Sequence, residues 1–432
     1  MSQITNRMEK VAMPGLRRLL VWAAAAMGTL PGQPSPFHRA VIKPSIVRVA
    51  PGGQQRFKVV ILATRLMAAQ APRNVTWSVN GIPGGNAEVG TIDATGLYRA
   101  PAAVPAPNEV VVRGEVEGAA NRYVWATVIV GRADPAYKVV ASWGEDLGQP
   151  GTHLVAPHGI SIDHEGRLLI TDQGAGRVFR YSKEGKFLDE IGLGPGSGDG
   201  QFTEPRYAHV DAKGNIYTVD LKSDRPRIQV FSPEGTFLRI FAPKGTGPGM
   251  ILRGHGLWFD SQGRLYVTDV DNMRVSVFDA AGEFQFAFGK DGPGAADFNA
   301  PHGLYLDPND DVFVNSYYGP TKKFDRHGNY LFSFAHGDPP DGPVYFHSLT
   351  GDRWGNVYLT VRTRAGYDGA VESNLGRKVS IAKYNNNGDF ICNISLSVPE
   401  HAESWCAVDA DGTIYALYKG RKRAGVEILK QQ

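Results

Sequence analysis

Four of the chain's 11 histidines occupy one position of a motif that the chain repeats. The motif is clearest as APHGISIDHEGRLLITD at residues 156–172, where the histidine stands five residues before the first aspartate. Four histidines at a single position indicate a shared environment. In the six copies this position holds His158, Arg206, His255, His302, His347 and Ser404.

Imidazole nitrogens at this position have the chemistry of metal ligands. Three histidines that leave a fourth coordination position open form a catalytic zinc geometry. In a ring of six equal units, alternate units lie roughly 120° apart, so His158, His255 and His347 are predicted to bind one divalent metal ion, zinc. The alternative is a turn device, in which the imidazole bonds to the neighbouring backbone and the following glycine supplies a positive φ.

The copies of the motif predict short antiparallel strands. Each aspartate is followed by a turn such as EG at 165–166 or QG at 262–263, and then by an alternating strand such as RLLITD or RLYVTD. A third strand and a fourth follow with further glycine turns. Four such strands per unit are typical of a propeller blade, and six units predict a six-bladed β-propeller over residues 138–432. The aspartates are Asp163, Asp211, Asp260, Asp307, Asp352 and Asp409.

The last unit has only three strands before the chain stops at Gln432. A candidate for its missing outer strand is YKVVASWGE at 137–145, which resembles the fourth strand of the other units. We expect this segment to complete the last blade, because pairing removes an open sheet edge and closes the ring.

Residues 1–32 resemble an export signal. Arg17 and Arg18 precede the apolar run LLVWAAAAMGTL at 19–30, and PGQPSP then breaks any helix. A twelve-residue run is too short to cross a hydrocarbon core about 30 Å thick. We therefore predict a periplasmic or extracellular protein without a permanent membrane span.

Residues 41–131 alternate in another style, with strands such as VTWSVNG and YVWATVIVG. This pattern predicts a small β-sandwich, joined to the propeller by a linker at 132–137. The segment resembles bacterial Ig-like domains, which implies a spacer or adhesion module. Trp77 is expected in its core.

Charge and cysteine content add limits. The formal net charge of +3 over 432 residues gives no reason to expect a nucleic-acid partner. Cys392 is predicted in an outer strand and Cys406 in an inner strand of the next blade, about three strand spacings of ~4.8 Å apart. That separation is too long for a disulfide.

The loops on the histidine side of the propeller are rich in cations, which favours an anionic ligand. The 17-residue loop at 362–378 is long enough to act as a lid. Tyr317, Tyr318 and Tyr367 are candidate catalytic phenols, with Arg206 and Arg364 as catalytic cations. The loop cations are Lys222, Arg225, Arg227, Lys322, Lys323, Arg362, Arg364, Lys419, Arg421, Lys422 and Arg423.

The repeat units resemble NHL repeats over nearly all of 138–432. Among NHL-like propellers, the peptidyl-α-hydroxyglycine α-amidating lyases carry three zinc-binding histidines in alternate blades. His158 in APHG, His255 in RGHG and His347 in YFHS match those positions. The resemblance implies cleavage of a carbinolamide with release of glyoxylate. It does not extend to the lyases' catalytic tyrosine, since Lys222 stands at the corresponding place.

Two functions follow from these observations. The first is a metal-dependent lyase or hydrolase with an anionic small-molecule or peptide substrate, in which Arg206 or His302 orients a carboxylate and Lys222 and Arg362 assist binding. The second is a non-catalytic module whose basic face binds a peptide, a glycan or a partner protein. The propeller shape does not choose between them.

Overall fold

The structure, a computed structural model, describes residues 39–62, 74–147, 152–221, 227–316, 319–335, 344–363, 380–398 and 403–432. All named elements in these ranges are β-strands, so the prediction of an all-β chain is confirmed. Within the same ranges, no helix has the length and apolar character needed to cross a bilayer. The predicted export signal lies outside the described residues.

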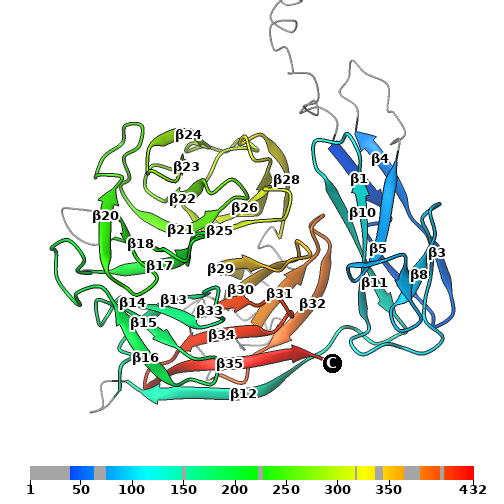
Figure 1. Cartoon of the computed structure of the whole chain (residues 1–432), viewed down its shortest axis with the longest axis horizontal. Helices are drawn as coiled ribbons and strands as arrows, with labels where there is room; N and C mark the ends of the chain where they lie inside the picture. The colour runs from blue at the N-terminus through cyan, green and yellow to red at the C-terminus, as the bar shows by residue number, and fades with distance from the viewer. Residues whose placement is uncertain are drawn as a thin grey trace, which may run out of the picture.

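The described residues from 137 onward form six four-stranded antiparallel sheets (Figure 1), and in five of them the strands follow the chain from the inner strand outward. Five sheets are continuous in sequence, and the sixth takes its outer strand from residues before the first sheet. The sheets are β13 (Pro157–Ile162), β14 (Leu168–Asp172), β15 (Arg177–Tyr181) and β16 (Phe187–Ile191); β17 (Pro205–Val210), β18 (Ile216–Asp220), β19 (Arg227–Phe231) and β20 (Phe237–Phe241); β21 (Gly254–Phe259), β22 (Leu265–Asp269), β23 (Arg274–Phe278) and β24 (Phe284–Phe288); β25 (Pro301–Leu306), β26 (Val312–Ser316), β27 (Thr321–Phe324) and β28 (Tyr330–Phe334); β29 (Val344–Gly351), β30 (Val357–Thr363), β31 (Ser380–Tyr384) and β32 (Phe390–Ser395); and β33 (Glu403–Val408), β34 (Ile414–Lys419), β35 (Arg423–Gln431) and β12 (Tyr137–Asp146).

The sixth sheet is closed by a strand from the start of this region, as the sequence predicts. β12 pairs antiparallel with β35, from Tyr137 opposite Gln431 to Asp146 opposite Arg423. The inner strands also contact one another in sequence, and β13 contacts both β17 and β33. The first and last inner strands are therefore neighbours, and the sheets form a closed ring.

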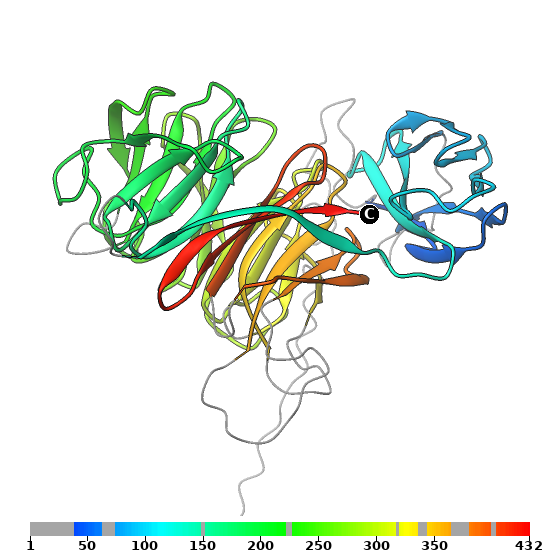
Figure 2. The same ribbon diagram turned by 90° about the horizontal axis from the view of Figure 1, so that it is seen from below.

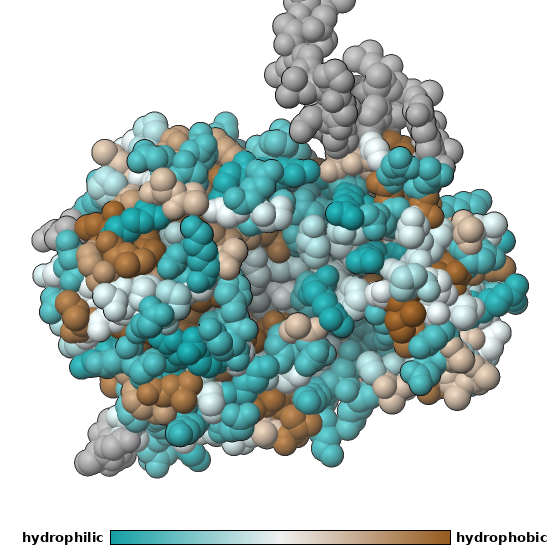
Figure 3. Space-filling view, in the orientation of Figure 1, coloured by the Kyte–Doolittle hydropathy of each residue, from teal (hydrophilic) through white to brown (hydrophobic). Residues whose placement is uncertain are grey.

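Apolar side chains gather between neighbouring sheets. Six hydrophobic clusters each join two adjacent sheets, and one of them contains Leu168 and Phe179 from the first sheet with Leu417 and Val426 from the last. Burying one such side chain contributes roughly 1.5–3 kcal/mol. On the outer surface, hydrophobic residues form small patches among hydrophilic ones (Figure 3). The ring is thus held together by packing of sheet faces.

The strands before residue 131 form three further sheets around one hydrophobic core. Trp77 and Tyr98 are buried in this core, so the expectation for Trp77 is confirmed. Figure 2 shows these strands as a separate body beside the six sheets. Their orders are β1 (Arg39–Lys43) with β4 (Lys58–Leu62); β2 (Ile46–Val49), β11 (Tyr123–Val130), β10 (Glu109–Val116), β5 (Val75–Val79) and β6 (Ile82–Pro83); and β3 (Gln54–Arg56), β9 (Leu97–Arg99), β8 (Gly90–Ile92) and β7 (Gly85–Asn86).

A buried ion pair joins the two bodies. Lys383 Nζ of β31 lies 2.7 and 2.8 Å from the two carboxylate oxygens of Glu109 in β10, and it donates to the Tyr137 hydroxyl at 3.0 Å. Both charged side chains are 3% exposed. Burial is the largest single influence and would lower the pKa of Lys383, but the charges of Glu109, Tyr137 and Asp352 and the hydrogen bond to Glu109 together raise it. This lysine therefore stays charged inside the interface.

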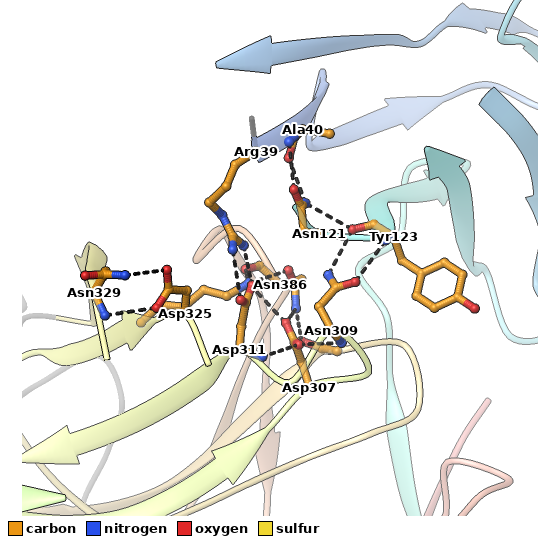
Figure 4. A network of polar contacts seen from close by, with 12 residues as sticks. Arg39, Ala40, Asn121, Tyr123, Asp307, Asn309, Asp311, Asp325, Asn329 and Asn386 are labelled. Atoms are coloured by element: carbon orange, nitrogen blue, oxygen red, sulfur yellow. Dashed lines mark hydrogen bonds and ion pairs between the residues drawn. The ribbon is translucent and has the colours of Figure 1, made fainter. Parts of the chain in front are cut away.

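A second polar network joins β1 to the fourth sheet (Figure 4). The Arg39 guanidinium donates to Asp311, and Lys323 Nζ lies 3.1 Å from both Asp307 and Asp311. The backbone N–H of Tyr123 donates to Asn309 at 2.9 Å, and the Asn309 amide donates back to the Tyr123 carbonyl at 3.0 Å. The contacts are short and mostly buried, which fixes the amino-terminal strands against one side of the ring.

Replacing Glu109 with Ala should destabilise the protein by about 3–5 kcal/mol, because Lys383 would stay buried without a carboxylate. Calorimetric melting of the full chain measures the effect. The double variant Glu109→Leu with Lys383→Met removes both charges and should melt close to the wild type. A single variant that melts like the wild type would show that the pair does not couple the two bodies.

Candidate functional site

The repeated histidine position lies within the inner strand, at a β-bulge. The register of the inner hairpin shifts between Pro157 and Gly159 in the first sheet and between Pro301 and Leu304 in the fourth. Corresponding shifts occur in the second, third and fifth sheets, and the sixth pairs regularly. A bulge re-aims a side chain at the end of a strand. It explains why these residues turn toward the axis.

The glycine after three of these histidines serves close packing. Gly159, Gly256 and Gly303 have no positive φ, so the positive-φ part of the turn interpretation is wrong for them. A Cβ on Gly256 would lie 2.9 Å from the His302 carbonyl oxygen, and one on Gly303 would lie 2.8 Å from the Leu349 nitrogen. The neighbouring inner strand comes too close for any side chain.

Two bulky residues fill the space that these glycines leave along the axis. The position after the repeated histidine holds Tyr207 in the second sheet and Trp405 in the sixth. Trp405 lies against the His158 and His347 rings, with centroids 5.0 and 4.9 Å away. Both residues line a constriction of about 10 Å³ below the histidines, which closes the channel there.

Polar residues of the second strands hold the bulged segments. The Thr268 hydroxyl accepts from Gly256 N–H at 2.8 Å and contacts the His302 carbonyl oxygen at 2.7 Å. Asn315 accepts from Gly303 N–H and donates to the Phe346 carbonyl. The threonine or asparagine near the end of the motif therefore positions the histidine of its own sheet and the strand of the next.

The second aspartate of the motif holds the segment that enters the inner strand. Asp172 accepts from the N–H groups of Val155 and Ala156 at 2.7 and 2.9 Å, and Asp269 accepts from Arg253 N–H at 3.1 Å. These buried carboxylates fix the backbone just before the repeated histidine. The first aspartate caps the hairpin turn instead, as Asp163 does by accepting from Arg167 N–H.

The four histidines meet around the axis. The ring centroid of His158 lies 5.1 Å from that of His255 and 5.9 Å from that of His347. His302 is 3.5 Å from His255 and 5.5 Å from His347. The structure thus brings together the three predicted metal ligands and the fourth histidine.

Hydrogen bonds orient three of these rings. The Nδ1 atoms of His158, His302 and His347 lie 3.2, 2.8 and 3.5 Å from the carbonyl oxygens of Arg206, His347 and Ser404. Each acceptor is the equivalent residue of the following sheet. A histidine whose Nδ1 bonds to a carbonyl presents Nε2 as its metal-binding atom.

His255 differs from the other three. Both of its ring nitrogens are buried without a hydrogen-bond partner among the described residues. Burial lowers the pKa of His158, His255 and His302 well below 6.5, with the neighbouring histidines and Arg206 acting in the same direction. These imidazoles are neutral, as metal ligands must be.

The histidines line a cavity of about 360 Å³ that carries more positive than negative groups. Arg206, Arg253 and Lys419 line it together with Glu403. Lys419 Nζ lies 3.2 Å from Glu403, and Arg253 pairs with Asp271 at 2.7 Å. Burial lowers the pKa of Arg206, whose guanidinium contacts Glu204. Three cations and one carboxylate thus line the cavity, and each cation has a carboxylate partner.

The donor set fits a cation in its chemistry. Imidazoles that bind one zinc ion at ~2.0–2.1 Å have centroids about 5 Å apart, close to the separations of His158 from His255 and His347. Such an ion would give one of the two His255 ring nitrogens a partner, and neither nitrogen has a hydrogen-bond partner among the described residues. In the placement that the described residues have, however, no three His, Cys, Asp or Glu side chains form a ready ligand set.

Other predicted site residues have mixed outcomes. Arg206 and His302 lie in the histidine cavity, as expected. The predicted residues Lys222, Tyr317, Tyr318, Arg364 and Tyr367, and the side chain of Arg362, lie outside the described residues.

Three predicted loop cations are in fact buried in strands. Arg227 donates to the carbonyls of Ser197, Gly198 and Gln201. Lys322 donates to the Asp297 carbonyl, and Lys323 pairs with aspartates inside its sheet. The prediction that these three add charge to the rim is wrong, because loops 221–227 and 316–323 are shorter than expected and their last residues begin β19 and β27.

Gln173, Arg253 and Glu403 also line the cavity, although they were not predicted from the sequence. Arg253 stands two residues before His255, and Glu403 one residue before Ser404. The positions one and two residues before the repeated histidine could have indicated Arg253 and Glu403, since this part of each inner strand lies at the cavity mouth.

Comparison with known proteins identifies an NHL repeat at residues 255–278, which run from His255 to the end of β23. Peptidyl-glycine alpha-amidating monooxygenase B of Xenopus laevis is 32% identical over 158 residues, covering 34% of this chain and 17% of that protein. NHL repeat-containing protein 3 of Homo sapiens is 32% identical over 128 residues, covering 27% of this chain and 37% of that protein. The chain is thus homologous to these proteins over part of its length, and it spans well under two thirds of either.

Among solved structures, virginiamycin B lyase from Staphylococcus aureus matches with a TM-score of 0.46 at 13% identity. The match covers 68% of this chain and 99% of that chain. It concerns the propeller-like fold alone.

Replacing Gly303 with Ala should destabilise the protein by about 1–3 kcal/mol through overpacking, because the new Cβ would meet Asn315 Oδ1 at 2.6 Å. Gly247→Ala is the matched control, since its Cβ would make only an ordinary contact of 3.4 Å with Met250. Melting temperatures of both variants test this. If Gly303→Ala and Gly247→Ala melt at the same temperature, neighbouring inner strands can move apart to accept a Cβ, and the close-packing argument is wrong.

Acidification should destabilise the fold in the presence of a chelator. Unfolded histidines take up protons near pH 6.5, whereas the buried ones resist, so the folded state binds fewer protons below that pH. The free energy of unfolding should fall as the pH drops through 6.5, by at most about 1.4 kcal/mol per pH unit for each histidine. Calorimetry across this range on the wild type and His302→Gln checks it: the variant should show a shallower fall, and parallel curves would contradict the assignment.

Proposed function

We propose that this protein is a metal-dependent lyase or hydrolase that acts on an anionic substrate at the histidine cavity. The observation that carries the proposal is the convergence of His158, His255 and His347 from alternate sheets beside a cationic cavity mouth. The NHL repeat and the partial homology to a protein named as a peptidyl-glycine alpha-amidating monooxygenase support it. The substrate class to test first is a peptide ending in α-hydroxyglycine.

The proposal includes the organisation of the chain. Residues 138–432 would form a six-bladed NHL propeller, and 41–131 an Ig-like domain joined to it at 132–137. Residues 1–32 would direct export to the periplasm or the exterior. The six four-stranded sheets and the closing β12–β35 pair support the blade count.

The three histidines would hold a divalent metal, zinc, through their Nε2 atoms. The ion, when bound, would polarise a substrate oxygen. Carbonyl groups of the following sheets orient the His158 and His347 rings for this task. Burial keeps His158 and His255 unprotonated, so they need not release a proton before they bind a cation.

The remaining chemistry falls to the charged residues of the cavity. Arg206 would bind the substrate carboxylate, with Arg253 and Lys419 drawing the anion toward the mouth. Glu403 lines the same cavity and would take the proton from the substrate hydroxyl. The C–N bond would then break as the aldehyde carbonyl of glyoxylate forms, and Glu403 would return the proton to the departing amide nitrogen. His302 would hold the position of His255, whose ring lies 3.5 Å away.

Metal analysis of the purified full chain tests the ligand set. The wild type should carry about one transition-metal ion per chain, and His255→Ala should lose it. His209→Gln is the matched control: this histidine stands at the other end of an inner strand, and its loss should leave the metal content unchanged.

An assay for glyoxylate release from an α-hydroxyglycyl peptide tests the reaction. Wild-type protein with metal should release glyoxylate, and His255→Ala should not. The purified wild type could instead contain no metal, release no glyoxylate and still bind a peptide, a glycan or a protein. That result would favour the non-catalytic module.

A further inference from the structure

The segment that enters the inner strand is held differently in the fourth sheet than in the first three. In those three sheets, the backbone N–H two residues before the repeated histidine position donates to the second aspartate of the motif. The fourth sheet has Ser316 in place of this aspartate. The three regular contacts are Ala156 to Asp172 at 2.9 Å, Glu204 to Asp220 at 2.7 Å and Arg253 to Asp269 at 3.1 Å.

A sulfur atom takes over this contact in the fourth sheet. The Ser316 hydroxyl is buried and has no hydrogen-bond partner among the described residues. The N–H of Ala300, two residues before His302, donates instead to the thioether sulfur of Met273 at 3.1 Å. Met273 lies in the loop between β22 and β23 of the third sheet. The start of the fourth inner strand therefore depends on a thioether of the neighbouring sheet.

The backbone is unusual at both ends of this contact. Met273 has a φ of 52° and Ala300 a φ of 55°. Gly176 has the position of Met273 in the first sheet, with a φ of 61°, and the residues that correspond to Ala300 in the first three sheets have no positive φ. A residue other than glycine keeps such a conformation only where its surroundings impose it, and such residues gather at functional sites. The contact with Met273 is part of what imposes it on Ala300.

This contact bears directly on the histidine cavity. Ala300 lines the cavity, and a single proline separates it from His302. The His302 ring centroid is 3.5 Å from that of His255, and its Nδ1 is 2.8 Å from the His347 carbonyl oxygen. Because proline fixes its own φ, a shift of the Ala300 backbone is passed on to His302. The sulfur of Met273 thus helps to set the position of one of the four rings.

The sulfur is also a group that a small oxidant can change. Met273 is half-buried, and hydrogen peroxide is little larger than a water molecule. In the reaction the sulfur attacks one peroxide oxygen, the O–O bond breaks, and the sulfur loses two electrons to the peroxide. The proton of the transferred oxygen passes to the departing hydroxide, which leaves as water. Sulfoxide reductases reverse the product, methionine sulfoxide.

The sulfoxide cannot keep the contact that the thioether makes. The sulfur and the Ala300 nitrogen are 3.1 Å apart. An oxygen added between them needs about 2.9 Å to the nitrogen for its own hydrogen bond, besides the length of the S–O bond. An oxygen added on the other side of the sulfur leaves a poorer acceptor facing the N–H. In both cases the hold on Ala300 is lost or lengthened.

We propose that Met273 is an oxidation-sensitive switch for the histidine cavity: its conversion to methionine sulfoxide by a peroxide releases Ala300 and moves His302 away from His255. Reduction of the sulfoxide returns the ring to its place. The switch does not rest on the proposed reaction, because it concerns contacts of the protein with itself.

Peroxide treatment of the full chain tests the proposal. Mass spectrometry of its peptides should find one added oxygen on Met273. Deuterium exchange of the peptide that contains Ala300 and His302 should then be roughly tenfold faster, since one hydrogen bond no longer protects it. Methionine sulfoxide reductase should restore the slow exchange. The proposal is overturned if Met250, which is 38% exposed, is oxidised while Met273 is not, or if exchange is unchanged after Met273 is oxidised.

Variants assign the effect to this sulfur. Met273→Gln carries a polar oxygen like that of the sulfoxide and should exchange fast without peroxide. Met273→Leu has no sulfur and should lose the response to peroxide, whereas the matched control Met250→Leu should respond like the wild type.

A chemical probe follows the ring itself. His302 is 7% exposed, so diethyl pyrocarbonate should modify it slowly in the reduced protein and faster after oxidation. If Met273→Leu and the wild type respond equally to peroxide, and both melt cooperatively, the sensitive methionine lies elsewhere and the switch is refuted.

Discussion

The close approach of neighbouring inner strands is the constraint on which the rest of this structure depends. At Gly256 and Gly303 the next strand leaves no room for a Cβ, and at Gly159 the Arg206 carbonyl oxygen would lie 2.7 Å from one. Because the strands are this close, histidines from separate sheets come within ring contact. Tyr207 and Trp405 then close the axis where glycine has removed side chains. One steric condition thus produces the histidine cluster and divides the channel into two cavities.

The two cavities differ in character although the same six strands build both. The histidine cavity is lined by neutral imidazoles, and a second cavity of about 500 Å³ at the other ends of the inner strands is lined by the rings of His209, Trp258 and Tyr305. The difference arises from repeat positions only three residues apart, such as His158 and Ser161 or His255 and Trp258. The two ends of a repeated strand can therefore line cavities of different chemistry, provided that side chains in the middle of the strand fill the channel between them.

The amino-terminal strands are joined to the ring by buried charges. Lys383 with Glu109, and Lys323 with Asp307 and Asp311, lie between packed elements, where a lone charge would be costly. Such pairs select one orientation, because any other would leave a buried charge without its partner. Lys323, together with Lys322 and Arg227, explains why a count of loop cations overestimates the charge at the channel mouth.

Much of this organisation can be predicted from the sequence, because the strand and turn patterns are local and recur. The repeat positions, the closing strand at 137–145 and the shared position of four histidines all follow from spacing. The sequence could not show that the glycine after three of the four histidines serves close packing, since this depends on a strand of the next sheet. It also could not distinguish Lys323, buried against two aspartates, from a loop cation. Local periodicity in the sequence determined the strands and turns. Which side chains share a cavity depends on contacts between distant strands, and only the tertiary structure fixes those contacts.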